Sequence, residues 1–464
     1  MWRAGQALYT GTAFELRLFW LSALMQADSS ERSEFACRVV QWQQAFGRHH
    51  LPWQNTRDAY RIWVSEVMLQ QTQVSTVLRF YPPFIERFPS LAQLAIATLD
   101  EVLALWSGLG YYRRARFLHA CAQQVMRDYG GEFPADEKLL AKLPGIGRST
   151  AGAIAAFAFH RRAAILDGNV KRVLARFFAL ALDQQSSKSS AIFWSLAESL
   201  LPGSEAMPAY TQGLMDLGAT RCLVHQPLCK ACPLQDICEA RKAGSQHDYP
   251  LPKATKTLPL RQWMMLWISD GQRILLVRRP AKGIWASMWS LPEVHELAAD
   301  ALGRDSGVNA ITELAAAKPS MQQCMHQYWQ RACEHLLQTN DFSAFIQALL
   351  RASALEDAQF DYSFDIEQSF THFRLRAPVL CIRIGSNDSV FGSSHHAFEP
   401  VIGRGVYCSS METQSGLWLR FEDALAMGIP NALRKRLQAA LSGDLNGYAA
   451  AKTLPAVLNN RRAK

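Results

Sequence analysis

The chain has 464 residues, of which 49% are hydrophobic and 19% are charged. This is the composition of an ordinary globular protein with two or three domains, and no stretch is long and apolar enough to predict a membrane-spanning helix. The formal charge of +9 favours a polyanionic partner, although charge alone is weak evidence.

Residues 1–32 form an N-terminal extension that we expect to be disordered. Its apolar stretch, residues 14–21, is interrupted by Glu15 and Arg17, so it is a poor signal-peptide core. A targeting presequence stays an alternative to a plain extension, and translation from Met25 would remove most of the segment.

Residues 33–242 are predicted to form an all-α domain. Apolar residues recur there at three- and four-residue steps with Pro and Gly at the breaks, and no strand-like alternation of any length occurs. The clearest predicted helices cover residues 60–73, 99–106, 115–129 and 149–159.

Glu66 is the first candidate for chemistry. On a helix it shares one face with Trp63 and Gln70, and its neighbours are nearly all apolar or neutral polar. Most helical glutamates are solvated surface residues. In this apolar setting, however, the charged form is disfavoured, so the pKa rises and the carboxyl becomes usable as a general acid.

A glycine-rich turn over residues 143–152 joins two helical stretches. Gly145 and Gly147 let the backbone turn tightly and approach a ligand, and the next helix starts with free N–H groups. Leu143 and Ile146 would anchor the turn between the helices. A simple αα corner is the plain alternative, but the whole string favours a helix-hairpin-helix element that binds phosphate.

Asp167 follows that second helix, in the sequence Leu166-Asp167-Gly168-Asn169-Val170. It can cap the next helix and still lie close to the sugar of a nucleotide held by the turn. One carboxyl with a raised pKa and one ionised carboxylate are the pair that cleaves a glycosidic bond. The acid protonates the leaving group while the carboxylate faces the oxocarbenium-like sugar.

Four cysteines, Cys222, Cys229, Cys232 and Cys238, have the spacing C-x6-C-x2-C-x5-C. Zinc usually takes two C-x2-C pairs, whereas one such pair between wider gaps indicates an iron–sulfur cluster, [4Fe-4S], one per chain. Four free cysteines or two disulfides are the alternatives to this module over residues 222–238. The other cysteines show no pairing pattern, which favours a reducing, cytoplasmic compartment.

The character of the sequence changes after a polar, proline-containing linker over residues 243–258. Short β-type runs at residues 262–269, 273–279 and 377–384 predict an α+β domain over residues 259–450. This domain carries an insert over residues 296–360, in which residues 310–353 look helical and polar. Residues 451–464 are predicted to be a disordered tail.

The insert also contains four potential metal ligands, and their spacing fits no known metal motif. We therefore expect no metal there. The four residues are Cys324, His326, Cys333 and His335.

These segments together resemble adenine DNA glycosylases of the MutY type, within the helix-hairpin-helix superfamily of endonuclease III. The resemblance is close over residues 35–240 and loose beyond them. It rests on the cysteine quartet and on residues 63–74, 105–112, 143–152 and 166–170. It implies a helical catalytic domain, a C-terminal Nudix-like domain, and removal of adenine mispaired with 8-oxoguanine or guanine in double-stranded DNA.

The resemblance also implies a role for each matching residue. Glu66 protonates the adenine ring and helps to activate water. Asp167 stabilises the sugar cation or a covalent intermediate, and Asn169 helps to orient these groups. Gln71 and Tyr111 wedge into the duplex and hold open the space left by a flipped nucleotide.

Ser149 is the discriminating position of the turn. The resemblance implies that the endonuclease III relatives have a lysine at this position, which forms a Schiff base with the sugar. Serine cannot form a Schiff base. The sequence therefore implies a monofunctional glycosylase. Ser149, Leu143, Gly145 and Gly147 are the implied DNA contacts of the helix-hairpin-helix.

The second half of the chain resembles the domain that reads 8-oxoguanine in this family. Phe370-Thr371-His372 matches a Phe-Ser-His hairpin, with Thr where Ser is usual. The hydroxyl that could bond the oxidised base is kept, and the added methyl alters its setting. No R-E-x-x-E-E helix follows Gly283, so we expect this domain to bind DNA without hydrolysing nucleotides.

Three other functions fit these residues less well. Ser149 and the C-terminal domain disfavour a bifunctional pyrimidine-lesion glycosylase/lyase. A noncatalytic iron–sulfur protein does not explain Glu66 with Asp167, and a Nudix hydrolase would lack its metal ligands. We therefore expect a monomeric, cytoplasmic, nucleoid-associated glycosylase that binds DNA and no membrane.

Overall fold

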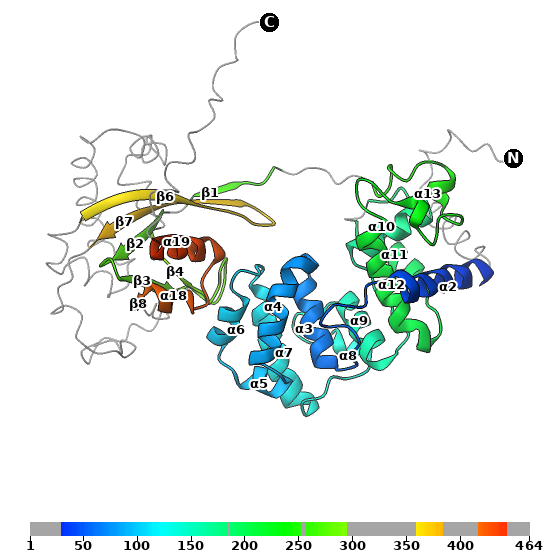
Figure 1. Ribbon diagram of the computed structural model, residues 1–464, viewed down its shortest axis with the longest axis horizontal. Helices are drawn as coiled ribbons and strands as arrows, with labels where there is room; N and C mark the ends of the chain where they lie inside the picture. The colour runs from blue at the N-terminus through cyan, green and yellow to red at the C-terminus, as the bar shows by residue number, and fades with distance from the viewer. Residues whose placement is uncertain are drawn as a thin grey trace, which may run out of the picture. The chain divides into compact units, whose positions relative to one another are not determined.

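The computed structural model of the chain describes residues 29–183, 186–251, 257–262, 264–294, 359–383 and 416–442. These residues form two compact units: one takes residues 29–96 and 117–251, the other residues 97–116 and those from 257 onward. Figure 1 labels the elements of both units. Most of the predicted N-terminal extension, nearly all of the insert with its four potential ligands, and the predicted tail lie outside the described residues.

Helices alone build the described part of the first unit, as the sequence predicted. The predicted helices at 99–106, 115–129 and 149–159 are confirmed with bounds within two residues. The elements here are α2 (Ser29–Phe46), α3 (Ala59–Leu69), α4 (Val74–Arg87), α5 (Leu91–Ile96), α7 (Arg113–Tyr129), α8 (Glu137–Leu140), α9 (Arg148–Phe159), α10 (Gly168–Phe177), α11 (Ser187–Ser199), α12 (Met207–Thr220) and α13 (Glu239–Lys242), with short 3-10 turns at Ser204–Ala206 and Cys229–Ala231.

An apolar core holds α2, α10, α11 and α12 together. Phe35 of α2 meets Phe177 of α10 edge to face, with ring centroids 4.7 Å apart. Gly213 of α12 lies directly against α2, because a Cβ added there would be 2.7 Å from Val39. Close packing at this glycine fixes α12 beside α2, and α12 in turn supports α10, which carries part of the candidate site.

Helix α3 ends at Leu69, although the sequence predicted a helix through residue 73. Gln70 leaves the helical conformation (φ −56°, ψ 113°), and Gln71 takes a left-handed φ of +54°. Glutamine is a good helix former, so neither periodicity nor propensity signalled the break. The break leaves Gln71 exposed at a corner between α3 and α4.

The second unit combines residues 97–116, which include α6 (Leu99–Trp106), with a mixed β-sheet and two C-terminal helices. The sheet has the order β1-β7-β2-β3-β4, with β6 beside β7, β5 beside β2 and β8 beside β3. Strands β1 and β2 run parallel to β7, and the other pairs are antiparallel. The elements are β1 (Leu260–Gln262), β2 (Met264–Ser269), β3 (Arg273–Arg278), β4 (Trp289–Ser290), β5 (Glu293–Val294), β6 (Gln359–Ser369), β7 (Arg374–Arg383), β8 (Gly416–Arg420), α18 (Phe421–Leu425) and α19 (Asn431–Leu441).

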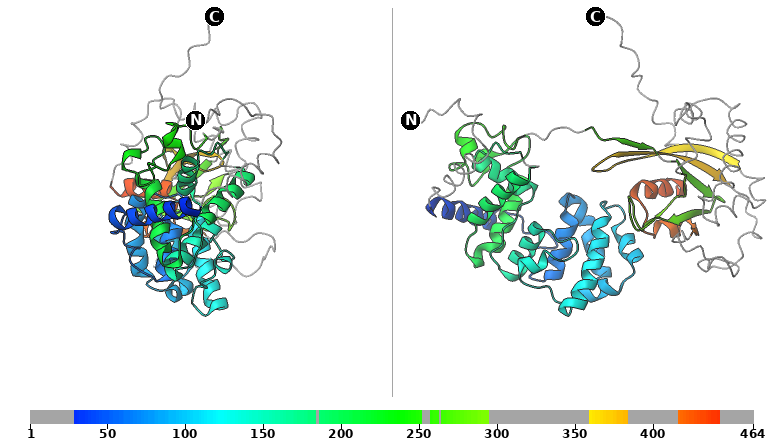
Figure 2. Two further views of the ribbon diagram at one scale, coloured as in Figure 1. Left: turned by 90° about the vertical axis from the view of Figure 1, so that its right-hand side faces the viewer. Right: turned by 180° about the vertical axis from the view of Figure 1, so that it is seen from behind.

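This arrangement confirms the predicted α+β class of the second half of the chain. The predicted β-type runs correspond to β2, β3 and β7. Strands β6 and β8 were not predicted. Strands β6 and β7 form the longest hairpin of the sheet, paired from Ser369 with Arg374 back to Gln359 with Arg383 (Figure 2).

Residues 97–116 are bonded to the rest of the second unit through polar contacts. Arg278 donates to both carboxylate oxygens of Asp100, at 3.0 and 2.8 Å. The Ser107 hydroxyl donates to the Ile429 carbonyl at 2.6 Å and accepts from Arg434 Nε at 3.0 Å. Ser107 is buried, so these bonds anchor the end of α6.

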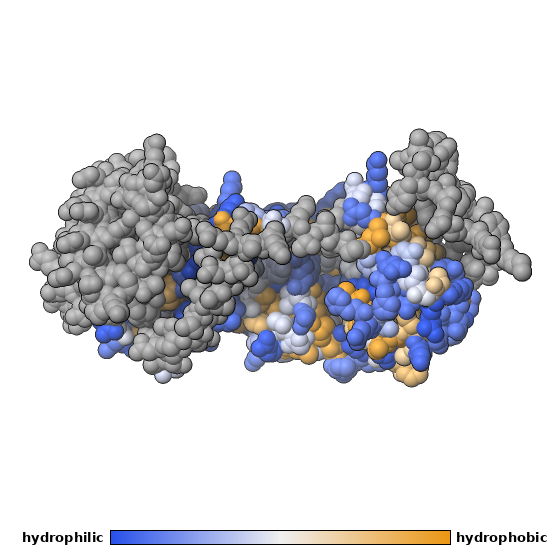
Figure 3. All heavy atoms as spheres, turned by 90° about the horizontal axis from the view of Figure 1, so that it is seen from above, coloured by the Kyte–Doolittle hydropathy of each residue, from blue (hydrophilic) through white to orange (hydrophobic). Residues whose placement is uncertain are grey.

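The described surface mixes hydrophilic residues with scattered apolar ones on the face drawn in Figure 3. Phe46 and Ile96 are the most exposed large apolar side chains of the described residues, 71% and 84% accessible. None of the described helices has the length and hydropathy needed to cross a bilayer.

Candidate functional site

Glu66 lies on α3 among buried neighbours, of which Trp63, Val64 and Val67 are at most 3% exposed. Burial, with a smaller contribution from the negative charge of Asp167, raises the pKa of Glu66 to about 8. The apolar setting that the sequence predicted is therefore present. It keeps this carboxyl protonated at neutral pH, as a general acid requires.

Asp167 caps the N-terminus of α10, as the sequence predicted. One carboxylate oxygen accepts from the Val170 backbone N–H at 2.7 Å, and the other accepts from the Asn169 amide at 3.4 Å. The positive end of the helix dipole also favours a carboxylate at this position. The structure thus brings together an acid that stays protonated and a second carboxyl group that caps α10 and accepts two hydrogen bonds.

Ser149 connects the glycine-rich turn to this carboxyl pair. Its hydroxyl accepts from the backbone N–H of Leu166, the residue before Asp167, at 2.9 Å. One residue later in α9, Thr150 accepts from the Gln70 amide at 3.2 Å. The start of α9 is therefore bonded to both chain segments that carry the carboxyls.

The turn itself has the form expected of a hairpin between α8 and α9. Leu143 and Ile146 are buried, 3% and 4% exposed, as anchors should be. Gly145 has a φ of +75°, and a Cβ there would lie 2.8 Å from Phe117. Gly147 is exposed, forms the N-cap of α9 and provides no side-chain cap, so the first N–H groups of α9 stay available to an anion.

Arg172 is a supporting residue that sequence reasoning missed. It is 9% exposed and donates to the Asn169 side-chain carbonyl at 2.8 Å, the Gly218 carbonyl at 2.7 Å and the Cys222 carbonyl at 2.8 Å. A Cβ at Gly218 would lie 2.5 Å from the Cβ of Asn169, so α12 packs directly behind that amide. An arginine three residues after Asn169, on a helix with an apolar face, was the available signal.

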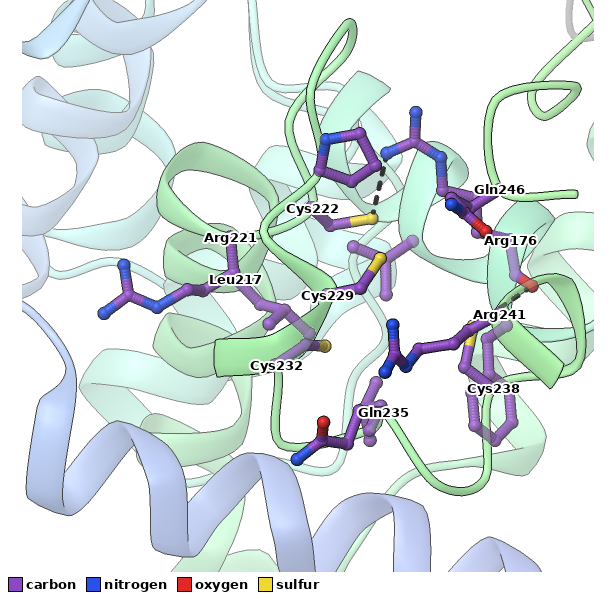
Figure 4. A pocket seen from close by; sticks show the side chains of 14 residues that line it. Arg176, Leu217, Arg221, Cys222, Cys229, Cys232, Gln235, Cys238, Arg241 and Gln246 are labelled. Carbon is purple, nitrogen blue, oxygen red and sulfur yellow. Dashed lines mark hydrogen bonds between the residues drawn. The ribbon is translucent and has the colours of Figure 1, made fainter. Parts of the chain in front are cut away.

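The four cysteines line a single cavity bounded by α10, α12 and the turns that follow α12 (Figure 4). Cys222 Sγ accepts from Arg176 Nη1 at 3.3 Å, and Cys238 Sγ lies 3.4 Å from the Arg176 carbonyl. Burial raises the pKa of the Cys232 thiol to about 12 and also raises the pKa of Cys222 and Cys238. The nearby cysteines add to each of these shifts, so the four thiols lie close to one another.

The four cysteines are a donor set that fits a metal group held by thiolates. None of the four cysteines forms a disulfide, which is contrary to the two-disulfide alternative. Among the described residues no three His, Cys, Asp or Glu side chains stand close enough for one metal ion. Four thiolates are the donor set of a [4Fe-4S] cluster, so four cysteines around one cavity fit such a group.

The two predicted wedge residues lie in different units, and each sits at a strained, exposed corner. Gln71 has a φ of +54°, and Tyr111 has a φ of +50° with half of its surface exposed (50%). Left-handed backbone is uncommon for residues other than glycine and is concentrated at functional sites. Both side chains are therefore held outward at some conformational cost.

Phe370-Thr371-His372 forms the tip of the hairpin between β6 and β7. Phe370 donates its N–H to the Phe373 carbonyl at 2.9 Å and stacks on that ring with centroids 4.8 Å apart. Thr371 and His372 are exposed on this aromatic base. Their polar groups are accessible to a ligand, and the stacked rings hold the tip in place.

Each half of the chain matches a known protein family. Residues 64–199 match the family model of the HhH-GPD superfamily base excision DNA repair proteins, and residues 263–439 match that of the NUDIX domain. The adenine DNA glycosylase of Buchnera aphidicola subsp. Baizongia pistaciae is 38% identical over 256 residues, 55% of this chain and 72% of that protein.

The Homo sapiens adenine DNA glycosylase is 34% identical over 348 residues, which cover 63% of this chain and 63% of the human protein. A solved thermostable thymine-DNA glycosylase is 29% identical with a TM-score of 0.43, covering 47% of this chain and all (100%) of that chain.

Proposed function

The chain belongs to the MutY-type family of adenine DNA glycosylases with a C-terminal Nudix-like domain, and we propose that it excises adenine mispaired with 8-oxoguanine or guanine. The reaction is hydrolysis of the N-glycosidic bond of a nucleotide flipped out of double-stranded DNA. The observation that carries this proposal is the pair formed by Glu66 and Asp167, of which the first stays protonated and the second caps α10 and accepts from Val170 and Asn169.

Each carboxyl has its own step. Protonated Glu66 gives its proton to a ring nitrogen of the adenine, and the bonding electrons leave with the base as the glycosidic bond breaks. Asp167, held by the Val170 N–H and by Asn169, faces the positive charge that develops on the sugar. Water then adds to the sugar carbon and passes its proton to the Glu66 carboxylate, which restores the acid.

The hairpin and the wedge residues bring the target base to this pair. The exposed glycines and the free N–H groups at the start of α9 suit a DNA phosphate. Gln71 and Tyr111, exposed on strained corners, would fill the space left in the duplex by the flipped adenine.

A monofunctional reaction follows from Ser149. A lyase needs an amine that forms a Schiff base with the sugar. Serine has none, and its hydroxyl already accepts the Leu166 N–H. We therefore expect an abasic site with an intact strand as the product.

A [4Fe-4S] cluster would be held by Cys222, Cys229, Cys232 and Cys238, one per chain. When bound, it would supply a rigid, oxidisable centre that fixes the loop between α12 and α13. Arg176 donates to the Cys222 sulfur, and Arg172 joins the Cys222 carbonyl to Asn169. Anaerobically purified protein should contain about four irons per chain; stoichiometric zinc would overturn this assignment.

The C-terminal domain is proposed to read the base opposite the adenine. Thr371 and His372 present polar groups at the exposed hairpin tip, and both can bond the oxidised guanine. No magnesium-binding glutamate helix follows Gly283 in the sequence, so we expect no nucleotide hydrolysis.

One substrate panel tests the proposed function. The full-length protein is incubated with duplexes that carry adenine opposite 8-oxoguanine, guanine, cytosine or thymine, and with a duplex that carries an oxidised pyrimidine. Free adenine from the first two alone, with strand breaks only after alkali, is the expected result. Release of a pyrimidine, or strand breaks without alkali, would favour the bifunctional lyase instead.

A further inference from the structure

Arg114 is a buried arginine in the first turn of α7, and it is hydrogen-bonded to the backbone on both sides of the Tyr111 Cα. Its side chain is 8% exposed, and its Nη2 donates to the Gly110 carbonyl at 3.0 Å. Its backbone N–H donates to the Tyr111 carbonyl at 2.8 Å. The side chain and main chain of one residue thus bond the carbonyls of the two peptide groups that flank the Tyr111 Cα.

The guanidinium also lies between two aromatic rings. Its Cζ is 5.5 Å from the ring centroid of Trp106 and 5.4 Å from that of Tyr111. Trp106 is fully buried and donates its own Nε1–H to the same Gly110 carbonyl at 3.1 Å. The fixed tryptophan therefore positions Arg114, and Arg114 lies against the tyrosine ring.

Tyr111 needs such support because its conformation is unfavourable. Its φ of +50° follows a Gly110 φ of +82°, so two successive residues are left-handed and only the first is a glycine. A residue with a Cβ pays for this conformation, and a free loop would relax it. The ring is half exposed, so apolar packing of the tyrosine alone is limited.

The charge of Arg114 persists at this site. Burial lowers the pKa of Arg114 to about 10, which leaves the guanidinium cationic at neutral pH. A cation over an aromatic ring is attracted most strongly where water is excluded. The interaction with Tyr111 is therefore of the stronger, desolvated kind.

We propose that Arg114 is a positioning residue that holds Tyr111 in its outward, left-handed conformation before DNA binds, so that the ring enters the duplex without reorganising the loop. The proposal deepens the proposed function, because it rests on the assignment of Tyr111 as a wedge. Arg114 acts through Tyr111 and contacts neither the base nor the sugar. Its loss should slow the flipping step and leave the later bond cleavage unchanged.

A double-mutant cycle tests this dependence. Arg114→Met and Arg114→Lys are made in the wild-type and in the Tyr111→Ala background, with Arg113→Met as the matched control on the exposed neighbour. A duplex with 2-aminopurine beside the mispaired adenine reports unstacking by its fluorescence, and single-turnover adenine release is measured on the same duplex. Thermal unfolding of each variant shows whether it is folded.

Arg114→Met should lower the unstacking equilibrium and the release rate by roughly tenfold in the wild-type background, and by less than about twofold when Tyr111 is already alanine. Arg114→Lys keeps the charge without the planar guanidinium, so its unstacking equilibrium and release rate should lie between those of wild type and Arg114→Met. If Arg114→Met does not fold, Arg114→Lys in both backgrounds gives the same comparison.

Equal losses in the two backgrounds, or no loss at all, would overturn the proposal, as would wild-type protein that leaves the 2-aminopurine stacked. Unstacking without adenine release in the wild type would instead reject the proposed function while leaving the positioning role intact.

Discussion

At the scale of one residue, the fold raises the pKa of Glu66 and so keeps this side chain protonated. Its ordinary pKa of 4.5 is raised to about 8 by burial and by Asp167, so the native protein holds a proton that the unfolded chain releases at neutral pH. The contribution of this group to stability is present in full below the unfolded pKa and is lost as pH rises through about 8. Protonated Glu66 is therefore favoured by the fold and is also the form that acid catalysis needs.

Glu66→Gln should bind the mispair yet release adenine about 10²–10⁴-fold more slowly, because the amide keeps the shape but has no proton to deliver. The amide does not ionise, so the variant should also be more stable than wild type above pH 7, on the order of 1–2 kcal/mol. Single-turnover release and denaturant unfolding measure both effects. The exposed Glu86→Gln, which should change neither, is the control, and near-normal release by Glu66→Gln would remove Glu66 from the mechanism.

The rate of adenine release should depend on pH with a definite sign. Protonated Glu66 is the active form, so the single-turnover rate should be level from about pH 6 to pH 7 and fall through the pKa of about 8 as the acid is lost. A rate that rises between pH 7 and pH 9, or one that is level across that range, would mean that another group supplies the proton.

The local sequence singled out Glu66 and Asp167 as candidates, but it did not single out Arg172, which supports Asn169. The apolar neighbours of Glu66 and the position of Asp167 after the turn were visible as local patterns. Arg172 was not, because an arginine on a helix is usually solvated and nothing local shows that Gly218 and Cys222, some fifty residues away (|i−j| 46 and 50), supply its acceptors.

At the scale of elements, the turn between α8 and α9 contains a glycine whose conformation and packing are both restrictive. Gly145 has both a positive φ and a neighbour, Phe117, that leaves no room for a Cβ. Gly147 has an ordinary φ of −83° and open space around it. The two glycines therefore differ within one short motif: Gly145 is required by the conformation of the turn, whereas we propose that Gly147 allows the backbone to approach DNA closely.

Gly145→Ala should lower the free energy of unfolding by roughly 1–3 kcal/mol and weaken duplex binding, because the turn must shift to admit the methyl group. Gly147→Ala, the matched control, should cost less stability and act mainly on binding, since its Cβ would stand where a phosphate approaches. Denaturant unfolding and duplex affinity at fixed salt measure the pair. Equal stability of the two variants would contradict the assigned role of Gly145.

Helix α3 shows where local patterns mislead. The run from Tyr60 to Gln73 has helical propensity throughout, yet the chain leaves the helix at Gln70. The bond from the Gln70 amide to Thr150 is made 80 residues away in sequence, so no local window contains it. The same holds for β8, whose partner β3 lies far earlier in the chain. Strand β6 pairs with β7 in a local hairpin and was not predicted although its partner is close in sequence.

At the scale of the whole molecule, the residues proposed for catalysis and for DNA recognition come from both units. Glu66, Asp167 and the hairpin belong to the first unit, whereas Thr371, His372 and the Tyr111 loop belong to the second. From the sequence we predicted that residues 97–116 belong to the helical domain. Hydrogen bonds such as that from Ser107 to Ile429, 322 residues apart, cannot be predicted from local sequence patterns. The domain boundaries drawn from the sequence stay a prediction.

Thr371→Ala and His372→Ala should each reduce the preference for adenine opposite 8-oxoguanine over adenine opposite guanine. A hydrogen bond to the oxidised base whose partner is left unpaired is worth about 1–3 kcal/mol, so the preference should fall roughly tenfold. Affinity and single-turnover rate on both duplexes decide the matter. Equal losses on the two substrates would mean that the hairpin tip supports binding without sensing the lesion.

The most direct test of the central claim is the product of a single turnover on a duplex with adenine opposite 8-oxoguanine, analysed for free base and for strand breaks. We predict that the wild-type protein releases free adenine and leaves a strand that breaks only after alkali, and that Glu66→Gln binds the same duplex and releases none. Wild-type protein that binds the duplex without releasing adenine, or Glu66→Gln that releases it at the wild-type rate, would contradict the account.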